Sequence, residues 1–205
     1  MQRIGIYGGS FNPVHFGHVG LAKWVIENTD LDELWLMVSP LNPLKANTPA
    51  SNSASDLTSN FQQRLAAVKE AVKDIPGVKA SDFECSLPRP SYTANTLRSL
   101  QQAYPGVEFT LVIGEDNIAI FDRWREYEYI LANFRIFVYP RTSSRQTGGA
   151  ASAEEGYKNL FPGVAVKELR FLTAAPLFNI SSTEIRAEMS RISPLPSDRI
   201  RSIAP

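Results

Sequence analysis

The fold is decided by the stretch Gly8-Gly9-Ser10-Phe11-Asn12-Pro13-Val14-His15-Phe16-Gly17-His18. It follows the apolar run 4–7, which has the character of a buried strand, and it leads into an apolar helical pattern. Glycines after a strand allow a tight turn and let the backbone approach a phosphate without a Cβ in the way. The helix that follows points its free amides and positive dipole end at the ligand. The stretch therefore predicts a strand-to-helix turn that binds phosphate.

Strand-like and helical patterns alternate along the rest of the chain. Apolar runs typical of buried strands lie at residues 4–7, 34–38, 109–113, 134–139 and, less clearly, 164–172. Helical patterns lie between them at residues 21–26, 61–72, 97–104 and 118–131, the last long enough for two short helices. This alternation favours a parallel sheet covered on both faces. We therefore expect a single Rossmann-like α/β domain over residues 1–205, doubly wound around a mainly parallel sheet.

Two further features describe the organisation of the chain. Phe61, Leu65, Val68 and Val72 recur at helical spacing, so they should share one buried face. Segments 42–60 and 142–156 are poor in apolar residues and are expected to be long loops.

The composition excludes several classes of protein. Lys and Arg together number 21, as do Asp and Glu, and this balance favours a small-molecule partner over a nucleic acid. The single Cys85 excludes an internal disulfide and a zinc site built from several cysteines. No stretch has the pattern of a signal peptide or a membrane span. We expect a cytoplasmic protein without a membrane partner, and a homo-oligomer is compatible with the sequence.

His15 and His18 are the only histidines, and their spacing of three puts both imidazoles on one side of a helix's first turn. A metal site would need further Cys or His ligands. Two purely structural histidines at a helix start are the other alternative. The whole stretch 8–18 resembles the HxGH signature of the nucleotidyltransferase superfamily, in the form found in nicotinate mononucleotide adenylyltransferases. The resemblance implies that both histidines bind the triphosphate of ATP and stabilise the charge moving onto pyrophosphate.

A second phosphate motif lies near the C-terminus and reads Asn179-Ile180-Ser181-Ser182-Thr183-Glu184-Ile185-Arg186. Its serines and threonine are good N-caps, so a plain helix start is the alternative interpretation. Arg186 lies one turn inside the helix, where a guanidinium could reach an anion held at the helix start. The segment resembles the ISSTxxR element of the same family, which binds ATP phosphates.

Lys45 follows the second expected strand in Pro40-Leu41-Asn42-Pro43-Leu44-Lys45 and could reach a phosphate as a mobile charge. A solvated surface lysine is the alternative. The family usually has His-Lys at the end of this run. Leu44 replaces the histidine here, so only Lys45 carries over.

Two segments resemble the elements with which the family binds the acceptor. Residues 91–97 resemble SYTxxTL, in which Thr93 could cap a helix whose N-terminus holds the pyridine carboxylate. Trp124 could stack on the pyridine ring, with a core tryptophan as the alternative. Glu115 departs from the small residue usual in the family, and its charge would repel phosphates unless it points away. Arg141 ends an expected strand, where many relatives have an arginine.

The resemblance implies adenylyl transfer from ATP to nicotinate mononucleotide, a step of NAD biosynthesis, with Mg²⁺ held mainly by the phosphates and not by a protein metal site. Other acceptors (nicotinamide mononucleotide, phosphopantetheine or flavin mononucleotide) and a non-catalytic nucleotide sensor are the alternatives. ATP binding is assigned to Gly8, Gly9, Ser10, Phe11, His15, His18, Ile180, Ser181, Ser182 and Arg186. Acceptor binding is assigned to Asn12, Lys45, Tyr92, Thr93, Asp116, Trp124 and Arg141. Catalysis is assigned to His15, His18, Lys45 and Arg186.

Overall fold

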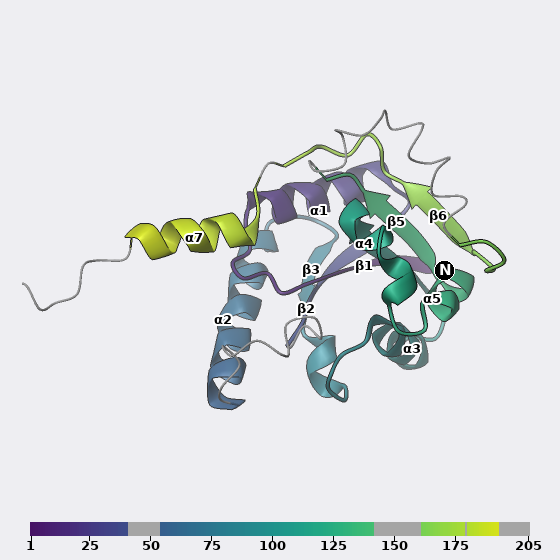
Figure 1. The fold of residues 1–205 in the computed structure, drawn as a ribbon, viewed down its shortest axis with the longest axis horizontal. Helices are drawn as coiled ribbons and strands as arrows, with labels where there is room; N and C mark the ends of the chain where they lie inside the picture. The colour runs from purple at the N-terminus through teal and green to yellow at the C-terminus, as the bar shows by residue number, and fades with distance from the viewer. Residues whose placement is uncertain (41–53, 142–160, 179, 193–205) are drawn as a thin grey trace, which may run out of the picture.

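A computed structural model describes residues 1–40, 54–141, 161–178 and 180–192 (Figure 1). Its centre is a six-stranded sheet in the order β3-β2-β1-β4-β5-β6, and every neighbouring pair is parallel. The strands are β1 (Gln2–Gly9), β2 (Glu33–Val38), β3 (Val78–Ser81), β4 (Val107–Gly114), β5 (Arg135–Tyr139) and β6 (Glu168–Phe171). The strand order reverses direction between β1 and β4. The structure thus confirms the Rossmann-like α/β class and shows a wholly parallel sheet within the described residues.

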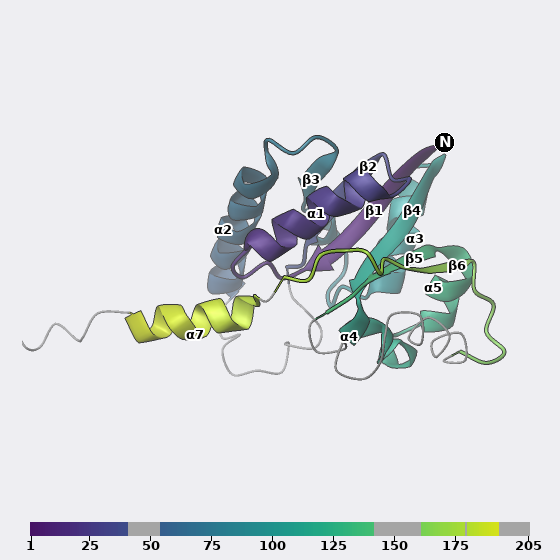
Figure 2. The ribbon, with the colours of Figure 1, turned by 90° about the horizontal axis from the view of Figure 1, so that it is seen from above.

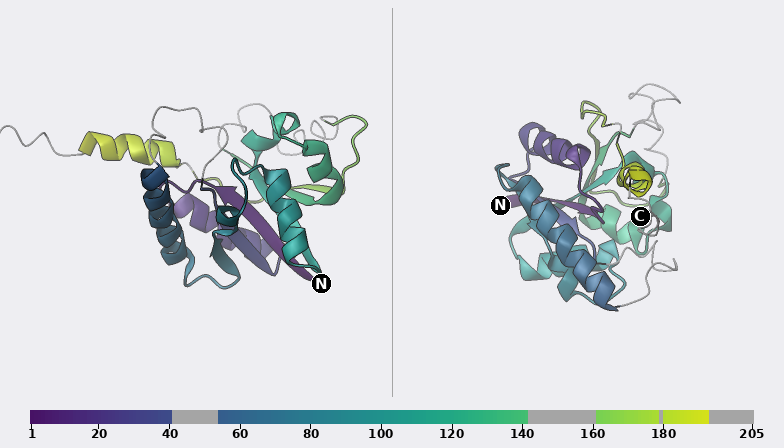
Figure 3. Two further views of the ribbon diagram at one scale, coloured as in Figure 1. Left: turned by 90° about the horizontal axis from the view of Figure 1, so that it is seen from below. Right: turned by 90° about the vertical axis from the view of Figure 1, so that its left-hand side faces the viewer.

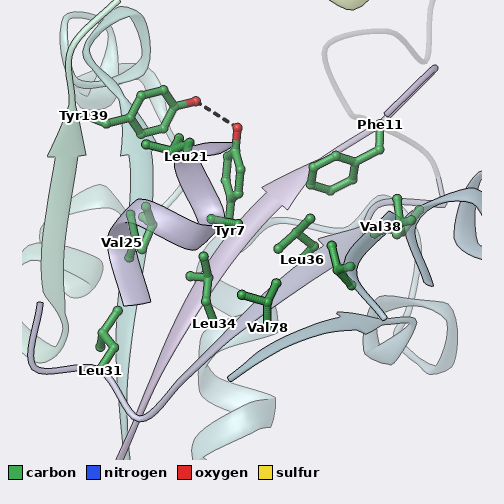
Figure 4. Packing of buried hydrophobic residues seen from close by; sticks show 14 of the residues in the cluster. Tyr7, Phe11, Leu21, Val25, Leu31, Leu34, Leu36, Val38, Val78 and Tyr139 are labelled. Carbon is green, nitrogen blue, oxygen red and sulfur yellow. Dashed lines mark hydrogen bonds between the residues drawn. The ribbon is translucent and has the colours of Figure 1, made fainter. Parts of the chain in front are cut away.

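Helices cover both faces of the sheet (Figure 2). The helical segments are α1 (Phe16–Asn28), α2 (Ala54–Val72), η2 (Phe83–Ser86), α3 (Thr93–Ala103), α4 (Glu115–Ile118), η3 (Phe121–Arg123), α5 (Tyr127–Asn133) and α7 (Ser182–Ile192). Successive side chains of β1 point to opposite faces. Tyr7 packs in the cluster that α1 and α2 cover (Figure 4). Ile4 and Ile6 pack in the other cluster, beneath α3 and α5. The carboxyl ends of the strands are therefore flanked by helices on both sides.

The expected apolar face of α2 is confirmed, because Phe61, Leu65, Val68 and Val72 are all buried against the sheet. The expected loop 42–60 is wrong in its last part, since the helix already begins at Ala54. Apolar periodicity marks only the part of a helix that packs on the core, so it could not locate the polar turns before Phe61. The remainder of that segment and all of 142–156 lie outside the described residues.

Three other elements differ from the expectation. The short edge strand β3 was not expected, because four residues with only Val78 buried give too little periodicity. The strand expected at residues 164–172 is confined to Glu168–Phe171. The helical pattern at residues 118–131 corresponds to three short pieces, α4, η3 and α5, instead of two. Each difference concerns an element too short for a clear pattern.

The last described helix, α7, begins beside the turn between β1 and α1 and projects away from the body of the molecule (Figures 1 and 3). Only its first turn is therefore placed to contribute to a site in the sheet. Among the described residues, no helix combines the length and the apolar character needed to cross a membrane.

Candidate active site

A cleft of about 550 Å³ lies at the carboxyl ends of β1, β2, β4 and β5. The starts of α1, α3, α4 and α7 also contribute residues to its wall. It straddles the point between β1 and β4 where the strand order reverses, which is where open α/β sheets hold their ligands. Of the residues assigned from sequence, those that line it are Gly8, Gly9, Ser10, Phe11, His15, His18, Tyr92, Thr93, Asp116, Trp124, Arg141, Ile180, Ser181 and Ser182.

The turn after β1 is shaped by Phe11. Its φ of 44° lies in the left-handed region, which is unusual for a bulky residue, and its side chain is only 2% exposed. The ring meets His18 edge-on, with 5.0 Å between the ring centroids. Burial of this ring in the core offsets the cost of the backbone conformation and orients the first turn of α1.

His15 and His18 lie together at the start of α1. His15 is the N-cap, and its backbone N–H donates to Nδ1 of His18 at 3.2 Å. The two imidazole rings lie against each other at a tilt of 31°, with their centroids 3.7 Å apart. Because Nδ1 of His18 accepts a hydrogen bond, a neutral His18 ring must carry its proton on Nε2. His18 can therefore donate a hydrogen bond from Nε2 in the first turn of α1.

Both histidines are neutral at physiological pH. Burial lowers the pKa of His18 to about 3, and the neighbouring His15 and the positive charge of Arg141 act in the same direction. Burial and Arg141 also lower the pKa of His15. The Nδ1 contact agrees with this, since protonation there would set two N–H groups against each other. Each neutral ring carries one N–H that can donate a hydrogen bond to an anion.

We expect the stability of the fold to fall as the pH decreases from 7 to 5, with His18 responsible for part of the loss. Between its pKa of about 3 in the folded chain and the ordinary 6.5, the unfolded chain binds more protons, so stability decreases as the pH is lowered. The loss from His18 should reach up to about 2 kcal/mol at pH 5. Urea unfolding at pH 7 and pH 5 measures it.

The matched variant for this experiment is His18→Gln, in which the dependence on pH should be weaker than in the wild type. Glu84 acts in the opposite sense, because burial raises its pKa, but it is common to both proteins. An equally steep dependence in the variant would contradict a depressed His18 pKa.

The start of α7 is docked on the turn after β1. Ser181 and Glu184 form a capping box: Ser181 Oγ accepts from the Glu184 N–H at 3.2 Å, and the Glu184 carboxylate accepts from the Ser181 N–H at 2.8 Å. Ser182 Oγ donates to the carbonyl of Pro13 at 2.9 Å. The two phosphate-binding segments expected from sequence therefore meet, although they lie at opposite ends of the chain.

Arg186 strengthens this docking. Its guanidinium donates to the carbonyl of Asn12 and, at 3.0 Å, to the hydroxyl of Thr183. Neither Arg186 nor Asn12 is among the described residues that line the cleft. The arginine thus ties the first turn of α7 to the turn after β1, and its contact with a bound anion stays a prediction.

The opposite wall of the cleft carries the residues assigned to the acceptor. Tyr92, and not Thr93 as expected, is the N-cap of α3, and Thr93 is the first helical residue. The first amide bonded within this helix is that of Thr96, which donates to the Tyr92 carbonyl, so the preceding amides are available to a ligand. Trp124 lines the cleft while packing on Phe121, with 4.9 Å between ring centroids.

An ion pair closes this wall beside the end of β4. Arg141 Nε lies 3.4 Å from the Asp116 carboxylate, and its terminal nitrogen donates to the hydroxyl of Tyr139 at 3.1 Å. Glu115 is the first residue of α4 and does not line the described cleft, so its charge is not directed at a ligand there.

Several cleft residues were missed from sequence, among them two tyrosines, a serine and a glutamate. Tyr7 and Tyr139 look like ordinary strand residues, yet their hydroxyls meet at the cleft floor. Ser91 is 7% exposed and its Oγ has no partner among the described residues. Glu84 is also buried, and its carboxylate accepts from the hydroxyl of Thr96 at 2.9 Å. The position of Ser91 in the SYTxxTL-like segment was the one available signal. Lys45 and Leu44 lie outside the described residues.

Comparison with known proteins shows which family the chain belongs to. Residues 6–188 match the model of the cytidylyltransferase-like family. The chain is 44% identical over 184 residues to a probable nicotinate-nucleotide adenylyltransferase from Bacteroides thetaiotaomicron, a match covering 90% of this chain and 80% of the relative. A probable nicotinate-nucleotide adenylyltransferase from Bacteroides fragilis is 42% identical over 188 residues, covering 92% and 82%.

Solved structures share the fold at low sequence identity. Nicotinic acid mononucleotide adenylyltransferase from Plasmodium falciparum, complexed with NaAD, superposes with a TM-score of 0.62 at 17% identity, covering 91% of this chain and 83% of that one. A putative nicotinate-nucleotide adenylyltransferase from Vibrio parahaemolyticus gives a TM-score of 0.56 at 21% identity, covering 93% and 88%.

Proposed function

Because this chain belongs to the cytidylyltransferase-like family, we propose that it acts as a nicotinate-nucleotide adenylyltransferase. It transfers the adenylyl group of ATP to nicotinate mononucleotide, giving nicotinate adenine dinucleotide and pyrophosphate, a step of NAD biosynthesis. The observation that carries the proposal is the docking of the α7 start on the turn that bears His15 and His18. Two helix starts then face one cleft, and a triphosphate is the kind of ligand that two such starts suit.

ATP occupies the β1 side of the cleft. The glycine backbone at Gly8 and Gly9 and the starts of α1 and α7 hold the triphosphate, and His18 donates from Nε2. Arg186, at the start of α7, and Lys45, which lies outside the described residues, add positive charge to the binding of the triphosphate. The histidines act neither as bases nor as metal ligands: they donate hydrogen bonds to the charge that moves onto the leaving pyrophosphate.

Nicotinate mononucleotide occupies the α3 side. Its carboxylate accepts hydrogen bonds from the amides that precede Thr96, where the helix dipole favours a negative charge. Trp124 stacks on the pyridine ring, and Tyr92, Asp116 and Arg141 complete the wall. Its 5′-phosphate then faces the triphosphate across the end of β4.

Catalysis of this reaction depends on positioning the two substrates more than on activating the attacking phosphate oxygen. A phosphate oxygen of the acceptor attacks the α-phosphorus of ATP in line, the bond to the β-phosphate oxygen breaks, and pyrophosphate leaves. The acceptor phosphate is already ionised at neutral pH, so no base is needed. Binding both polyanions at the proper distance and neutralising their charge accounts for the catalysis.

Magnesium accompanies ATP in this proposal. The cleft offers hard oxygen donors of the kind Mg²⁺ takes, with the Asp116 carboxylate on its wall, and the phosphates supply the other ligands. The ion would neutralise charge on the triphosphate. A cytoplasmic location, expected from the single Cys85, and a homo-oligomeric state belong to the same proposal.

The test is a pyrophosphate-release assay on the purified chain with ATP and Mg²⁺. We expect turnover with nicotinate mononucleotide and a kcat/KM about tenfold lower with nicotinamide mononucleotide, because the neutral amide gains less from the dipole of α3. Reactions without an acceptor are the control. Turnover only with phosphopantetheine or flavin mononucleotide would overturn the choice of acceptor, and ATP binding without any turnover would indicate a sensor.

A further inference from the structure

Two tyrosines meet at the floor of the cleft, and the proposed mechanism gives them no role. Tyr7 on β1 and Tyr139 on β5 are 5% and 7% exposed, and both line the cleft. Their hydroxyl oxygens are 3.3 Å apart, and the rings are edge-on with centroids 5.7 Å apart (Figure 4). In the sheet, β4 lies between their strands, so the pair bridges its end.

Tyr7 and Tyr139 have one more hydroxyl proton than the hydrogen bond between them uses. The two phenols carry two hydroxyl protons, and the single bond between them uses one. Arg141 is the other recorded partner, and it donates to Tyr139 without using a phenol proton. One O–H therefore has no acceptor among the described residues, although both hydroxyls are buried at a ligand cleft. A buried donor of this kind is expected to meet its acceptor when a ligand binds.

Arg141 decides which tyrosine holds the spare proton. A phenol oxygen that accepts from a cationic guanidinium becomes a stronger donor through its own O–H. The chain of donors therefore runs from Arg141 to Tyr139 and from Tyr139 to Tyr7. The hydroxyl proton of Tyr7 is the one left to face the cleft.

The surroundings of Tyr7 indicate what accepts this proton. Its ring lies beside Phe11, at 5.6 Å, and beside His18, at 6.2 Å between centroids, in the part of the cleft assigned to the triphosphate. The donor chain begins at a cation, which favours an anionic acceptor at its other end. Burial raises the pKa of Tyr7 well above its ordinary value, so the hydroxyl keeps its proton.

We propose that the Tyr7 hydroxyl donates a hydrogen bond to a phosphate oxygen of the bound nucleotides, and that Tyr139 is a positioning residue that orients this donor under the control of Arg141. The inference rests on the proposed function for the identity of the phosphate. It places a donor where the ATP side and the acceptor side of the cleft meet, which is where the α-phosphate of the transferred adenylyl group would lie.

Tyr7→Phe removes one oxygen atom and tests the proposal. We expect kcat/KM for pyrophosphate release to fall about tenfold, as for the loss of one donor to a charged acceptor. Tyr127→Phe, on α5, is the matched control, because among the described residues the Tyr127 hydroxyl bonds only to Glu128, at 3.5 Å. This variant should keep its activity within about twofold of wild type. A change of less than twofold in Tyr7→Phe, with the fold intact by circular dichroism, overturns the proposal.

The double variant tests the positioning role of Tyr139. Tyr139→Phe should lose about threefold, and Tyr7→Phe/Tyr139→Phe should be no worse than Tyr7→Phe alone, because Tyr139 acts through Tyr7. Multiplicative losses would overturn that role, since two independent structural effects would combine in this way. Thermal unfolding of all the variants shows how much of each loss comes from the fold.

Calorimetric titration separates this inference from the proposed function. If the wild type shows no adenylyl transfer, the affinities for ATP and for inorganic tripolyphosphate still show whether the Tyr7 hydroxyl donates to a phosphate. A loss of at least about fivefold in the affinity of Tyr7→Phe supports a phosphate contact. Equal affinities in both proteins, or no binding of either ligand by the wild type, contradict it.

Discussion

His18→Ala is expected to lower kcat by about 10²–10³-fold, the usual cost of removing one donor that stabilises charge in a transition state. The Nδ1 atom of His18 accepts from the His15 N–H, so the only donor of the neutral ring is Nε2–H, and His18 lines the cleft proposed to hold the triphosphate. Its depressed pKa keeps this donor neutral in the free protein. The larger share of the loss should fall on kcat and not on KM for ATP, because the charge on pyrophosphate grows during the reaction.

Steady-state pyrophosphate release measures this effect, with circular dichroism and thermal unfolding as checks on the fold. His18→Gln is the matched variant, since its side-chain amide still carries an N–H donor and should retain more activity than alanine. The chain has two histidines, so the imidazole signals of His15 can be followed separately by NMR in either variant. Turnover close to wild type in His18→Ala would exclude a catalytic role.

Gly114→Ala should lower kcat/KM for nicotinate mononucleotide by about 10²-fold, the cost of displacing positioning groups by an ångström or so. A Cβ built on Gly114 would lie 2.3 Å from the Asp116 carboxylate, 3.0 Å from Arg141 Nε and 3.2 Å from the Tyr139 ring. Real Cβ atoms do not approach neighbours to 2.3 Å, so the Asp116 side chain must turn away from Arg141. The loss should appear mainly as a raised KM for the acceptor.

Gly8→Ala is the control for this substitution. It lies at the end of β1 on the ATP side, and a Cβ there meets nothing within 4 Å. The fold should be as stable as wild type. If phosphate approaches this backbone closely, the KM for ATP should rise while that for the acceptor stays unchanged. The two alanine variants should therefore weaken different substrates, and an effect of Gly114→Ala on ATP alone would contradict the placement of the acceptor.

Much of the site was predictable because its parts are local. Glycines after an apolar run, histidines three apart and a serine before an acidic first turn each act through neighbours in the chain, and the structure has them in the cleft. Sequence reasoning erred where one residue shifts a cap, as with Tyr92 in place of Thr93. Caps are set by backbone dihedrals, and Tyr92 takes the extended N-cap conformation although Thr93 has the better capping side chain.

The sequence pattern could not predict which residues far apart in the chain contact one another. Arg186 was assigned to phosphate because an arginine one turn into a helix can reach the helix start, and that role stays a prediction. The structure shows a contact that no local pattern indicated, with the carbonyl of Asn12, 174 residues away. The helix that carries Arg186 projects from the body of the molecule (Figures 1 and 3), and this contact ties its first turn to the turn after β1.

The sequence by itself determined the alternation of strands and helices, the glycine turn after the first strand and the order of the motifs, since periodicity and turn chemistry are properties of neighbouring residues. Only the tertiary structure decided that Tyr7 and Tyr139, 132 residues apart, share one hydrogen bond, and that Arg141 orders their protons. Such contacts depend on which strands lie next to one another and on where each strand ends. A parallel sheet brings those ends to one edge whatever their separation in the chain, and this is why its cleft holds groups that no local pattern connects.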